Sequence, residues 1–309
     1  MPAATFAGRS AIGRVGALAV IAFGVFAAFT RLLFLRPCAV VGFGGYPALP
    51  VMTAAWLARI PSALHEQNAV LGRVNRRLAP HVRRVAASFP IVRFAPKGDS
   101  RVVMTGNPVR AEAVTLAAQN YVAPGASGAI RVLIFGGSQG ARALSVVVPE
   151  AMARLRVDLR GRLEIVQQAR PEDLEQVRET YAVAGIRADV ARFFEDLPRR
   201  MANAHLVIAR SGASTLGELT VMGRPSILVP YPSAMDDHQS ANAAVLTEAG
   251  AAWMVKQDAL DATKLAAMLE GIFDAPNELQ KRAAAAKALG RPDAARSLAD
   301  LVESLGEAA

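Results

Sequence analysis

A single strand–turn–helix segment constrains the fold of this chain more than any other feature. Residues 204–208 (Ala-His-Leu-Val-Ile) form the pattern of a short buried strand, and residues 216–222 form that of a helix. The Ser-Gly-Ala-Ser-Thr turn at 211–215 therefore lies at a helix N-terminus, where free backbone N–H groups and the helix dipole favour an anion. One turn later Glu218 can accept hydrogen bonds from two adjacent hydroxyls, as on a ribose. The segment indicates a nucleotide-diphosphate site; the alternative is a capped helix with a solvated glutamate.

A second glycine-rich turn precedes this segment. Residues 130–135 (Ile-Arg-Val-Leu-Ile-Phe) form a strand pattern that runs into Gly136, Gly137 and Ser138, and a helical pattern follows to about Leu155. Glycines between a strand and a helix let a ligand approach the backbone closely. The spacing does not match Gly-x-Gly-x-x-Gly, so the dinucleotide fingerprint is not met. Taken alone, this turn is a weak signal.

After Arg110 strand and helix patterns alternate with short connections, which is typical of a parallel sheet with crossover helices. The expected strands are 131–135, 163–167, 188–193, 206–208, 226–229 and 252–255, and the expected helices include 171–184 and 239–249. The preceding half is also α/β, with strands at 38–42, 62–65, 84–88 and 101–104 and helices at 48–59 and 70–79. A last helix is expected over about 292–305. At 309 residues the chain is long enough for two domains.

Charge is distributed unevenly along the chain. Residues 1–110 hold 14 basic and two acidic residues, a net charge of +12, whereas the remainder carries a net charge of −3. Such a basic half points to anionic lipid, pyrophosphate or nucleic acid. Nucleic acid is the weakest of the three, because no nucleic-acid-binding module or aromatic platform is present. The single cysteine, Cys38, rules out a disulfide framework, and its apolar surroundings predict burial.

An uncharged apolar segment covers residues 15–30, between Arg14 and Arg31. Its 16 residues are fewer than the roughly 20 that a spanning helix needs. We expect an interfacial helix whose flanking arginines meet anionic headgroups. A membrane span continuing through Arg31, a signal peptide and a plain core helix are the alternatives.

Three further motifs complete an ordered set: Gly42-Phe-Gly-Gly-Tyr-Pro47, His65-Glu-Gln-Asn68 and Gly106-Asn-Pro-Val-Arg110. Together with Gly-Gly-Ser-Gln-Gly at 136–140 and the Ser-Gly-Ala-Ser-Thr turn, they resemble the MurG family of peripheral membrane N-acetylglucosaminyltransferases. The resemblance runs from about Gly8 to the C-terminus. One feature of the family is absent from this chain: an opening strand with a Gly-Gly-Thr-Gly-Gly-His loop. We therefore expect the first domain to be incomplete.

The resemblance implies an α/β fold of two Rossmann-like domains facing a cleft, the glycosyltransferase-B architecture. The expected domains are an acceptor- and membrane-facing domain at 1–109, completed by the C-terminal helix at 292–309, and a UDP-sugar-binding domain at 110–291. The implied reaction is inverting transfer of N-acetylglucosamine from UDP-N-acetylglucosamine to lipid I, undecaprenyl-pyrophosphoryl-MurNAc-pentapeptide, which yields lipid II for peptidoglycan. The expected location is the cytoplasmic face of the cell membrane, with a peripheral attachment to anionic lipid and no nucleic-acid partner. No cofactor is expected, and no metal, since Asp236 and Asp237 are adjacent rather than spaced as a metal-binding dyad.

Residues for the donor follow from the turns and from the resemblance. Sugar transfer requires stabilisation of the leaving diphosphate, a proton acceptor for the attacking hydroxyl and a fixed donor sugar. The expected donor-binding residues are Asn68, Arg110, Ser138, Phe194, Ser214, Thr215, Glu218, Gln239 and Asn242. Among these, Arg110 is expected to bridge phosphate oxygens, Gln239 and Asn242 to bond the sugar, and the Phe194 backbone to pair with uracil. For Asn242, capping at a helix start is the alternative.

On the acceptor side the resemblance implies Gly44, Gly45, Tyr46 and His65. The catalytic base expected from the family is the histidine of the missing loop, so Glu66 is the best substitute among the groups present. Glu66 is equally consistent with a structural carboxylate bonded to neighbouring amides. Two further histidines are assigned structural or surface positions: His205 to the core and His81 to the surface.

Four functions remain open from the sequence. They are a working transferase, a truncated homologue that binds the donor but is impaired in catalysis, a nucleotide-sugar 2-epimerase of the same fold, and a non-enzymatic scaffold. An epimerase would need extra acids beside Glu218, and a scaffold would not need five intact ligand motifs. Transfer to lipid I is therefore the expected function.

Overall fold

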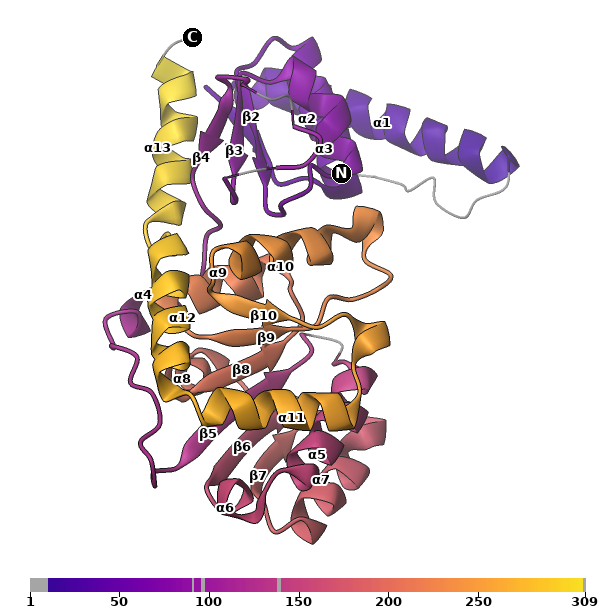
Figure 1. The fold of residues 1–309 in the computed structure, drawn as a ribbon. Helices are drawn as coiled ribbons and strands as arrows, with labels where there is room; N and C mark the ends of the chain where they lie inside the picture. The colour runs from indigo at the N-terminus through magenta and orange to yellow at the C-terminus, as the bar shows by residue number, and fades with distance from the viewer. Residues whose placement is uncertain (1–10, 91, 96–97, 138–139, 308–309) are drawn as a thin grey trace. The chain divides into compact units, whose positions relative to one another are not determined.

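A computed structural model describes residues 11–90, 92–95, 98–137 and 140–307 (Figure 1). The chain divides into two compact units, of which unit 1 comprises Met1–Asn107 with Asp293–Ala309 and unit 2 comprises Pro108–Pro292. Each unit is built on its own parallel sheet, as the alternation of strand and helix patterns predicts.

The sheet of unit 1 has four parallel strands in the order β1-β2-β3-β4. The strands are β1 (Val40–Gly42), β2 (Ser62–Glu66), β3 (Arg84–Ala87) and β4 (Val102–Met104). The helices of the unit are α1 (Ala11–Leu35), α2 (Gly45–Leu57), α3 (Arg73–Leu78) and α13 (Ala294–Glu307), with a 3-10 turn η1 (Ala79–His81) after α3. All five residues of β2 are buried, as expected of a central strand in a parallel sheet.

Proline and glycine explain where two helices of unit 1 differ from the predicted bounds. The helix expected at 70–79 ends at Leu78 and tightens into a 3-10 turn, because Pro80 lacks the N–H that an α-helix requires. The helix expected at 48–59 begins earlier, at Gly45. Gly44 and Gly45 both have positive φ angles, 77° and 71°, which glycine adopts without strain and which turn the chain sharply from β1 into α2.

Helix α1 is longer than the uncharged segment that predicted it. It extends through Arg31 to Leu35, and residues Gly16–Leu35 are long and apolar enough to cross a membrane by length and composition. One face packs on α2, where Ala28 and Leu32 are buried with Ala54 and Ala55. The opposite face exposes large apolar side chains to solvent: Leu18, Phe23, Phe26, Leu33 and Phe34.

The C-terminal helix α13 belongs to unit 1 and packs against β2. Its Gly306 lies so close to Cys38 that an added Cβ would be 3.0 Å from the cysteine Cβ. Cys38 itself is exposed, which corrects the expectation of burial: it lies two residues before β1, outside the sheet.

Unit 2 contains a six-stranded parallel sheet in the order β10-β9-β8-β5-β6-β7. The strands are β5 (Ile130–Phe135), β6 (Leu163–Gln168), β7 (Arg187–Ala191), β8 (Leu206–Ala209), β9 (Ser226–Leu228) and β10 (Ala252–Met254). The helices are α4 (Ala111–Leu116), α5 (Arg142–Arg154), α6 (Val157–Arg160), α7 (Leu174–Val183), α8 (Leu197–Asn203), α9 (Ala213–Met222), α10 (His238–Glu248), α11 (Ala262–Phe273) and α12 (Pro276–Leu289). Three 3-10 turns are η2 (Pro171–Asp173), η3 (Met235–Asp237) and η4 (Gln257–Ala259).

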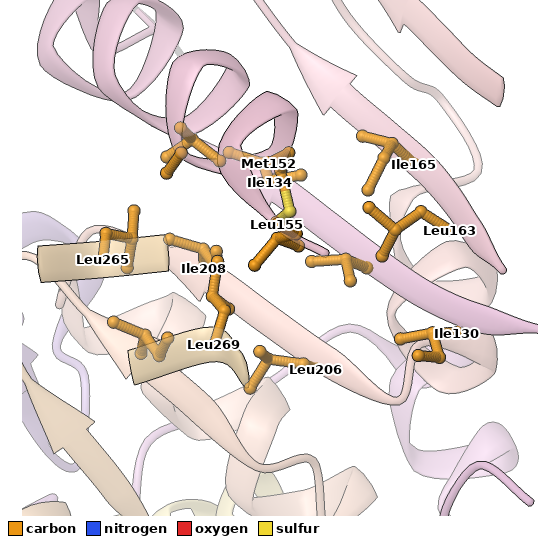
Figure 2. Close-up of a cluster of buried hydrophobic side chains, with 14 of the residues drawn as sticks. Ile130, Ile134, Met152, Leu155, Leu163, Ile165, Leu206, Ile208, Leu265 and Leu269 are labelled. Carbon is orange, nitrogen blue, oxygen red and sulfur yellow. The ribbon is translucent and has the colours of Figure 1, made fainter. Parts of the chain in front are cut away.

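The core of unit 2 lies between this sheet and helices α5 and α11 (Figure 2). Ile130 and Ile134 point to the same face of β5, because successive strand side chains alternate between faces. Side chains of the neighbouring strands and helices fill the same space: Leu163, Ile165, Leu206, Ile208, Met152, Leu155, Leu265 and Leu269. Each fully buried aliphatic side chain contributes about 1.5–3 kcal/mol, so this cluster supplies much of the stability of the unit.

His205, the residue before β8, is buried and forms a hydrogen bond with Arg131 of β5. Nδ1 of His205 accepts a hydrogen bond from the backbone N–H of Arg131 at 3.0 Å, and Nη2 of Arg131 lies 2.8 Å from Nε2. Burial, together with the charges of Arg131 and Arg224, lowers the pKa of His205 to about 4. The ring is therefore neutral at pH 7, and its position in the core is the one expected from the sequence.

We expect this histidine to make unit 2 less stable in mild acid. Between the ordinary histidine pKa of about 6.5 and the folded value of about 4, the unfolded chain binds the proton and the folded chain does not. The free energy of unfolding should therefore fall as the pH is lowered through this window, by roughly 2–3 kcal/mol at its acid end. Replacing His205 by Gln should remove that loss, whatever its effect at neutral pH.

Urea unfolding at several pH values between 7.5 and 4.5 measures the effect. The two tryptophans lie in different units, so a Trp56→Phe background leaves Trp253 to report on unit 2. His81→Gln, which changes an exposed histidine, is the control. A stability difference between wild type and His205→Gln that does not change with pH would contradict the assignment.

Candidate functional site

A pocket of about 390 Å³ opens in unit 2 at the carboxyl ends of β5 and β6, beside the first turns of α9. Five of its lining residues were predicted from the sequence: Arg110, Phe194, Ser214, Thr215 and Glu218. From β5 the chain winds outward to β6 and β7 and then returns to β8 on the other side of β5. The pocket therefore lies next to the point where the direction of winding reverses, the usual ligand site of such sheets.

The turn after β5 forms one wall of the pocket and depends on glycine. Gly137 lines the pocket with a φ of 85°, which favours glycine. A Cβ on Gly136 would lie 2.4 Å from the backbone nitrogen of Ala141, so no larger residue fits there. Ser138 lies outside the residues that the structure describes, and its donor contact stays a prediction.

The N-terminus of α9 forms a second wall. Gly212 caps the helix in an extended conformation without a side-chain hydrogen bond, and Ser214 and Thr215 of the first turn line the pocket. The first N–H groups of a helix have no intrahelical acceptor, and the helix dipole adds partial positive charge there. This wall is suited to a phosphate or diphosphate group.

Glu218 and Arg110 form a two-pronged ion pair in the same pocket. Nε of Arg110 donates to Oε1 of Glu218 at 2.6 Å, and Nη2 donates to Oε2 at 2.7 Å. The Glu218 side chain is 7% exposed and that of Arg110 is 50% exposed. These hydrogen bonds raise the pKa of Arg110. The sequence predicted both residues for the donor but did not predict that they bind each other.

Aromatic and amide groups complete the pocket. Phe194 is buried beneath the guanidinium of Arg200, 4.2 Å from its ring centroid, whereas Phe193 is exposed at the pocket. Gln168 was missed by the sequence analysis. Its Oε1 accepts from the Gly136 backbone at 3.2 Å, and its Nε2 donates to the Arg192 carbonyl at 3.2 Å. The signal that marks it is a pair of glutamines, Gln167 and Gln168, at the carboxyl end of β6.

Gln239 and Asn242 of α10 are not among the residues that line this pocket. Oε1 of Gln239 accepts from the Tyr231 backbone at 2.9 Å. Asn242 is fully buried, and its Nδ2 donates to the Ser211 carbonyl at 3.1 Å. Its side chain therefore makes a structural contact between α10 and the turn before α9. It does not cap the start of its own helix, which was the alternative expected from the sequence. Sugar contacts by these two residues stay predictions.

In unit 1 Glu66 lies at the end of β2 and accepts hydrogen bonds from the loop that follows and from α3. Oε1 accepts from the backbone and side-chain nitrogens of Asn68 at 3.0 and 3.3 Å. Oε2 accepts from the Gly72 backbone and from Nδ2 of Asn75, both at 2.8 Å. An ionised carboxylate has about four acceptor sites, so these four bonds occupy it. This geometry favours the structural alternative for Glu66 over a role as general base.

His65 is fully buried beside Glu66. Its Nε2 lies 3.0 Å from the Gly106 carbonyl and so carries the proton of a donor. Its Nδ1 has no hydrogen-bond partner among the described residues. Burial lowers its pKa. Gly44, Gly45 and Tyr46, the other residues predicted for the acceptor, lie at the start of α2. Within the described ranges no group of three or more His, Cys, Asp or Glu side chains is arranged to hold a metal ion.

Two family models match the chain. The glycosyltransferase family 28 C-terminal domain matches residues 131–298, and the glycosyltransferase family 28 N-terminal domain matches residues 7–87. The matched regions contain β1, β2 and β3 of unit 1 and the strands of unit 2 from residue 131 onward, whereas β4 lies between them.

Curated relatives are similar along nearly the whole chain. A UDP-N-acetylglucosamine–N-acetylmuramyl-(pentapeptide) pyrophosphoryl-undecaprenol N-acetylglucosamine transferase of Paramagnetospirillum magneticum is 52% identical over 97% of this chain and 81% of its own length. The transferase of the same name from a Methylobacterium species is 51% identical over 98% of this chain and 82% of its own length.

Solved structures agree. The crystal structure of Acinetobacter baumannii MurG is 31% identical, has a TM-score of 0.79, and aligns with 98% of this chain and 83% of its own. A UDP-N-acetylglucosamine 2-epimerase from Neisseria meningitidis has a TM-score of 0.64 at 14% identity, over 91% of this chain and 80% of its own, which shows the fold alone. The predicted fold of two Rossmann-like domains is thereby confirmed. From the identity and coverage of these relatives, the chain belongs to the MurG family of glycosyltransferases.

Proposed function

We propose that this chain transfers N-acetylglucosamine from UDP-N-acetylglucosamine to the N-acetylmuramyl-pentapeptide of lipid I, forming lipid II. The observation that carries the proposal is the pocket of unit 2, which combines a helix N-terminus, a buried carboxylate and a glycine turn. These are the groups needed for a diphosphate, for ribose hydroxyls and for close approach of a ligand to the backbone. Family membership supplies the reaction.

In this function the leaving UDP gains negative charge at its diphosphate as the bond to the sugar breaks. The backbone N–H groups at Ser214 and Thr215 are fixed in direction by α9 before the reaction begins. Fixed donors of this kind stabilise developing charge without having to reorganise, and each hydrogen bond to a charged group is worth about 1.5–3 kcal/mol. Stabilisation of the leaving group is therefore assigned to the first turn of α9.

Glu66 has a different role in this proposal. A general base needs a free lone pair directed at the proton it removes. The acceptor sites of Glu66 are taken by Asn68, Gly72 and Asn75. We infer that Glu66 shapes the loop after β2 and holds Asn68 in place, while the loop after β1, with Gly44, Gly45 and Tyr46, receives the acceptor.

Membrane attachment is assigned to α1. The C-terminal half of the helix is fixed to α2 through Ala28 and Leu32, which favours a helix lying in the interface over one that leaves the domain to span the bilayer. Its free face presents Phe23, Phe26 and Phe34, and Arg31 and Arg36 are exposed near its end. Apolar side chains at acyl-chain depth with arginines at anionic headgroups give a peripheral, charge-dependent attachment.

Turnover tests the function directly. Mixing the chain with UDP-N-acetylglucosamine and a soluble lipid I analogue should release UDP and form the disaccharide product.

Glu218→Ala should raise the Kd for UDP by about 10- to 1000-fold, because it removes one or two hydrogen bonds to a charged acceptor. Glu175→Ala, which alters an exposed glutamate of α7, should bind like wild type. Equal UDP affinity in wild type and Glu218→Ala would refute the ribose role.

Flotation with vesicles tests the attachment. The protein should float with vesicles containing anionic lipid, less with neutral vesicles, and less at high salt, because surface charge attraction is screened. Replacing Phe23, Phe26 and Phe34 by Ser should reduce flotation, while Val183→Ser, at an exposed valine of unit 2, should not. Attachment that survives high salt and alkaline carbonate would favour a spanning helix instead.

A further inference from the structure

Strand β7 is an outermost strand of the sheet of unit 2, and its outer edge has no neighbouring strand among the described residues (Figure 1). The carbonyl of Ala191 accepts from the N–H of Ala169, which follows β6, so the backbone groups of Ala191 point toward β6. Along a parallel strand these groups alternate in direction from one residue to the next. Those of Val190 and Ala188 therefore point outward, and Arg178 of α7 indeed reaches the Val190 carbonyl at 2.8 Å.

The exposed middle of this edge is free. The N–H and C=O of Ala188 point away from β6 and form no hydrogen bond within the part of the chain that the structure describes. On either side of Ala188 the edge is partly occupied, because the Ile186 N–H donates to the Tyr181 carbonyl at 2.9 Å and Arg178 holds the carbonyl of Val190. Unpaired backbone groups at a sheet edge can bind a strand of another chain. The edge thus offers one short pairing site, centred on Ala188.

One face of β7 is open as well. Side chains alternate between the faces of a strand, so Arg187 and Asp189 lie on the face opposite Ile186 and Val190, which belong to the core. Together with Glu164 of β6 they line a groove of about 470 Å³. The side chains of Arg187 and Asp189 are 73% and 54% exposed. Because all-parallel sheets normally have both faces covered, this side of the sheet is suited to further contacts in an assembly.

The charges beside Ala188 decide which partner fits. If two copies of β7 pair antiparallel about a twofold axis at Ala188, each Arg187 lies opposite the Asp189 of the other copy. These are pairs without mutual backbone hydrogen bonds, whose Cα atoms are about 4.5 Å apart and whose side chains are closest. An axis at Arg187 or at Asp189 would instead place like charges opposite each other. Asp189 accepts from Arg200 at 2.6 Å, and a carboxylate has further acceptor sites for the arginine of another copy.

We propose that the outer edge of β7 is a dimerisation surface, at which two copies of this chain pair antiparallel about a twofold axis at Ala188. The same patch on both copies forms the contact, as in most symmetric dimers. The pairing satisfies the free backbone groups of Ala188 and forms an Arg187–Asp189 ion pair on each side of the axis. Exposed ion pairs are individually weak and are screened by salt, so the dimer is reversible and dissociates more readily at high ionic strength.

Sedimentation velocity of the full chain over a range of protein concentrations tests the proposal. A mild non-ionic detergent covers the exposed apolar face of α1, so that association through that face does not contribute. Wild type should change from monomer to dimer as the concentration rises, and less so at high salt. Arg187→Asp and Asp189→Arg each place like charges opposite one another. Each should therefore raise the dissociation constant of the dimer about 10- to 100-fold.

A mixture of the two variants gives the most specific measurement. In a dimer of one Arg187→Asp chain and one Asp189→Arg chain, both facing pairs are again opposite in charge. The mixture should therefore form dimers that neither variant forms alone. Labelling one variant at Cys38, the single and exposed cysteine, makes these dimers visible by fluorescence-detected sedimentation. A loss of stability in either variant cannot produce this recovery.

The matched control is Glu248→Arg, which reverses an exposed charge on α10. Helix α10 packs on β10, at the other edge of the sheet, so this variant should dimerise like wild type. Thermal unfolding shows whether each variant is folded. Should a charge variant not fold, Ala188→Pro removes the outward N–H without removing a hydrogen bond to β6, and it should also prevent dimerisation.

Two results would overturn the inference. One is a wild type that stays monomeric at every concentration, which would leave the edge to an extended peptide of another protein. The other is a pair of charge variants that dimerise like wild type, or that show no recovery when they are mixed.

Discussion

The parallel direction of the strands is the constraint on which the chemistry of this chain depends. Six strands of unit 2 run the same way, so all their carboxyl ends, and the turns that follow them, meet at one edge of the sheet. The turns after β5 and β8 become neighbours there although more than 70 residues separate them in the sequence. Gly137 from the turn after β5 and Ser214 from the start of α9, which follows the turn after β8, thus line one pocket. The same rule in unit 1 brings Gly44, Glu66 and Ser88 to one edge of its sheet.

Two glutamates at these edges show how partners decide what a carboxylate can do. No cation is among the hydrogen-bond donors of Glu66. Its four hydrogen bonds come from amides of the loop after β2 and from the side-chain amide of Asn75 on α3. Its carboxylate consequently holds together the segment that follows β2. Glu218 receives two hydrogen bonds from one guanidinium and faces a pocket. The sequence alone does not distinguish these two glutamates. Their hydrogen-bond donors differ, and the difference favours a structural role for Glu66 and a binding role for Glu218.

Much of the fold follows from local patterns. Every strand predicted after Arg110 is present within two residues of its expected ends, because most of these parallel strands are short, largely apolar runs between turn residues. The site is predictable where a motif fixes the backbone, as with Ser214 and Thr215 before α9. The site is not predictable where a side chain forms a hydrogen bond with a residue that is distant in the sequence. Nothing near Asn242 in the sequence reveals its bond to the Ser211 carbonyl, and nothing near Gln168 reveals its bond to Gly136.

Net charge also fails to predict how the donor would be bound. The residues after Arg110 carry a net charge of −3, yet their proposed ligand is a polyanion. In the proposed function the diphosphate meets backbone N–H groups and the dipole of α9, about half an elementary charge. Such groups are fixed by the fold and do not lose side-chain entropy on binding.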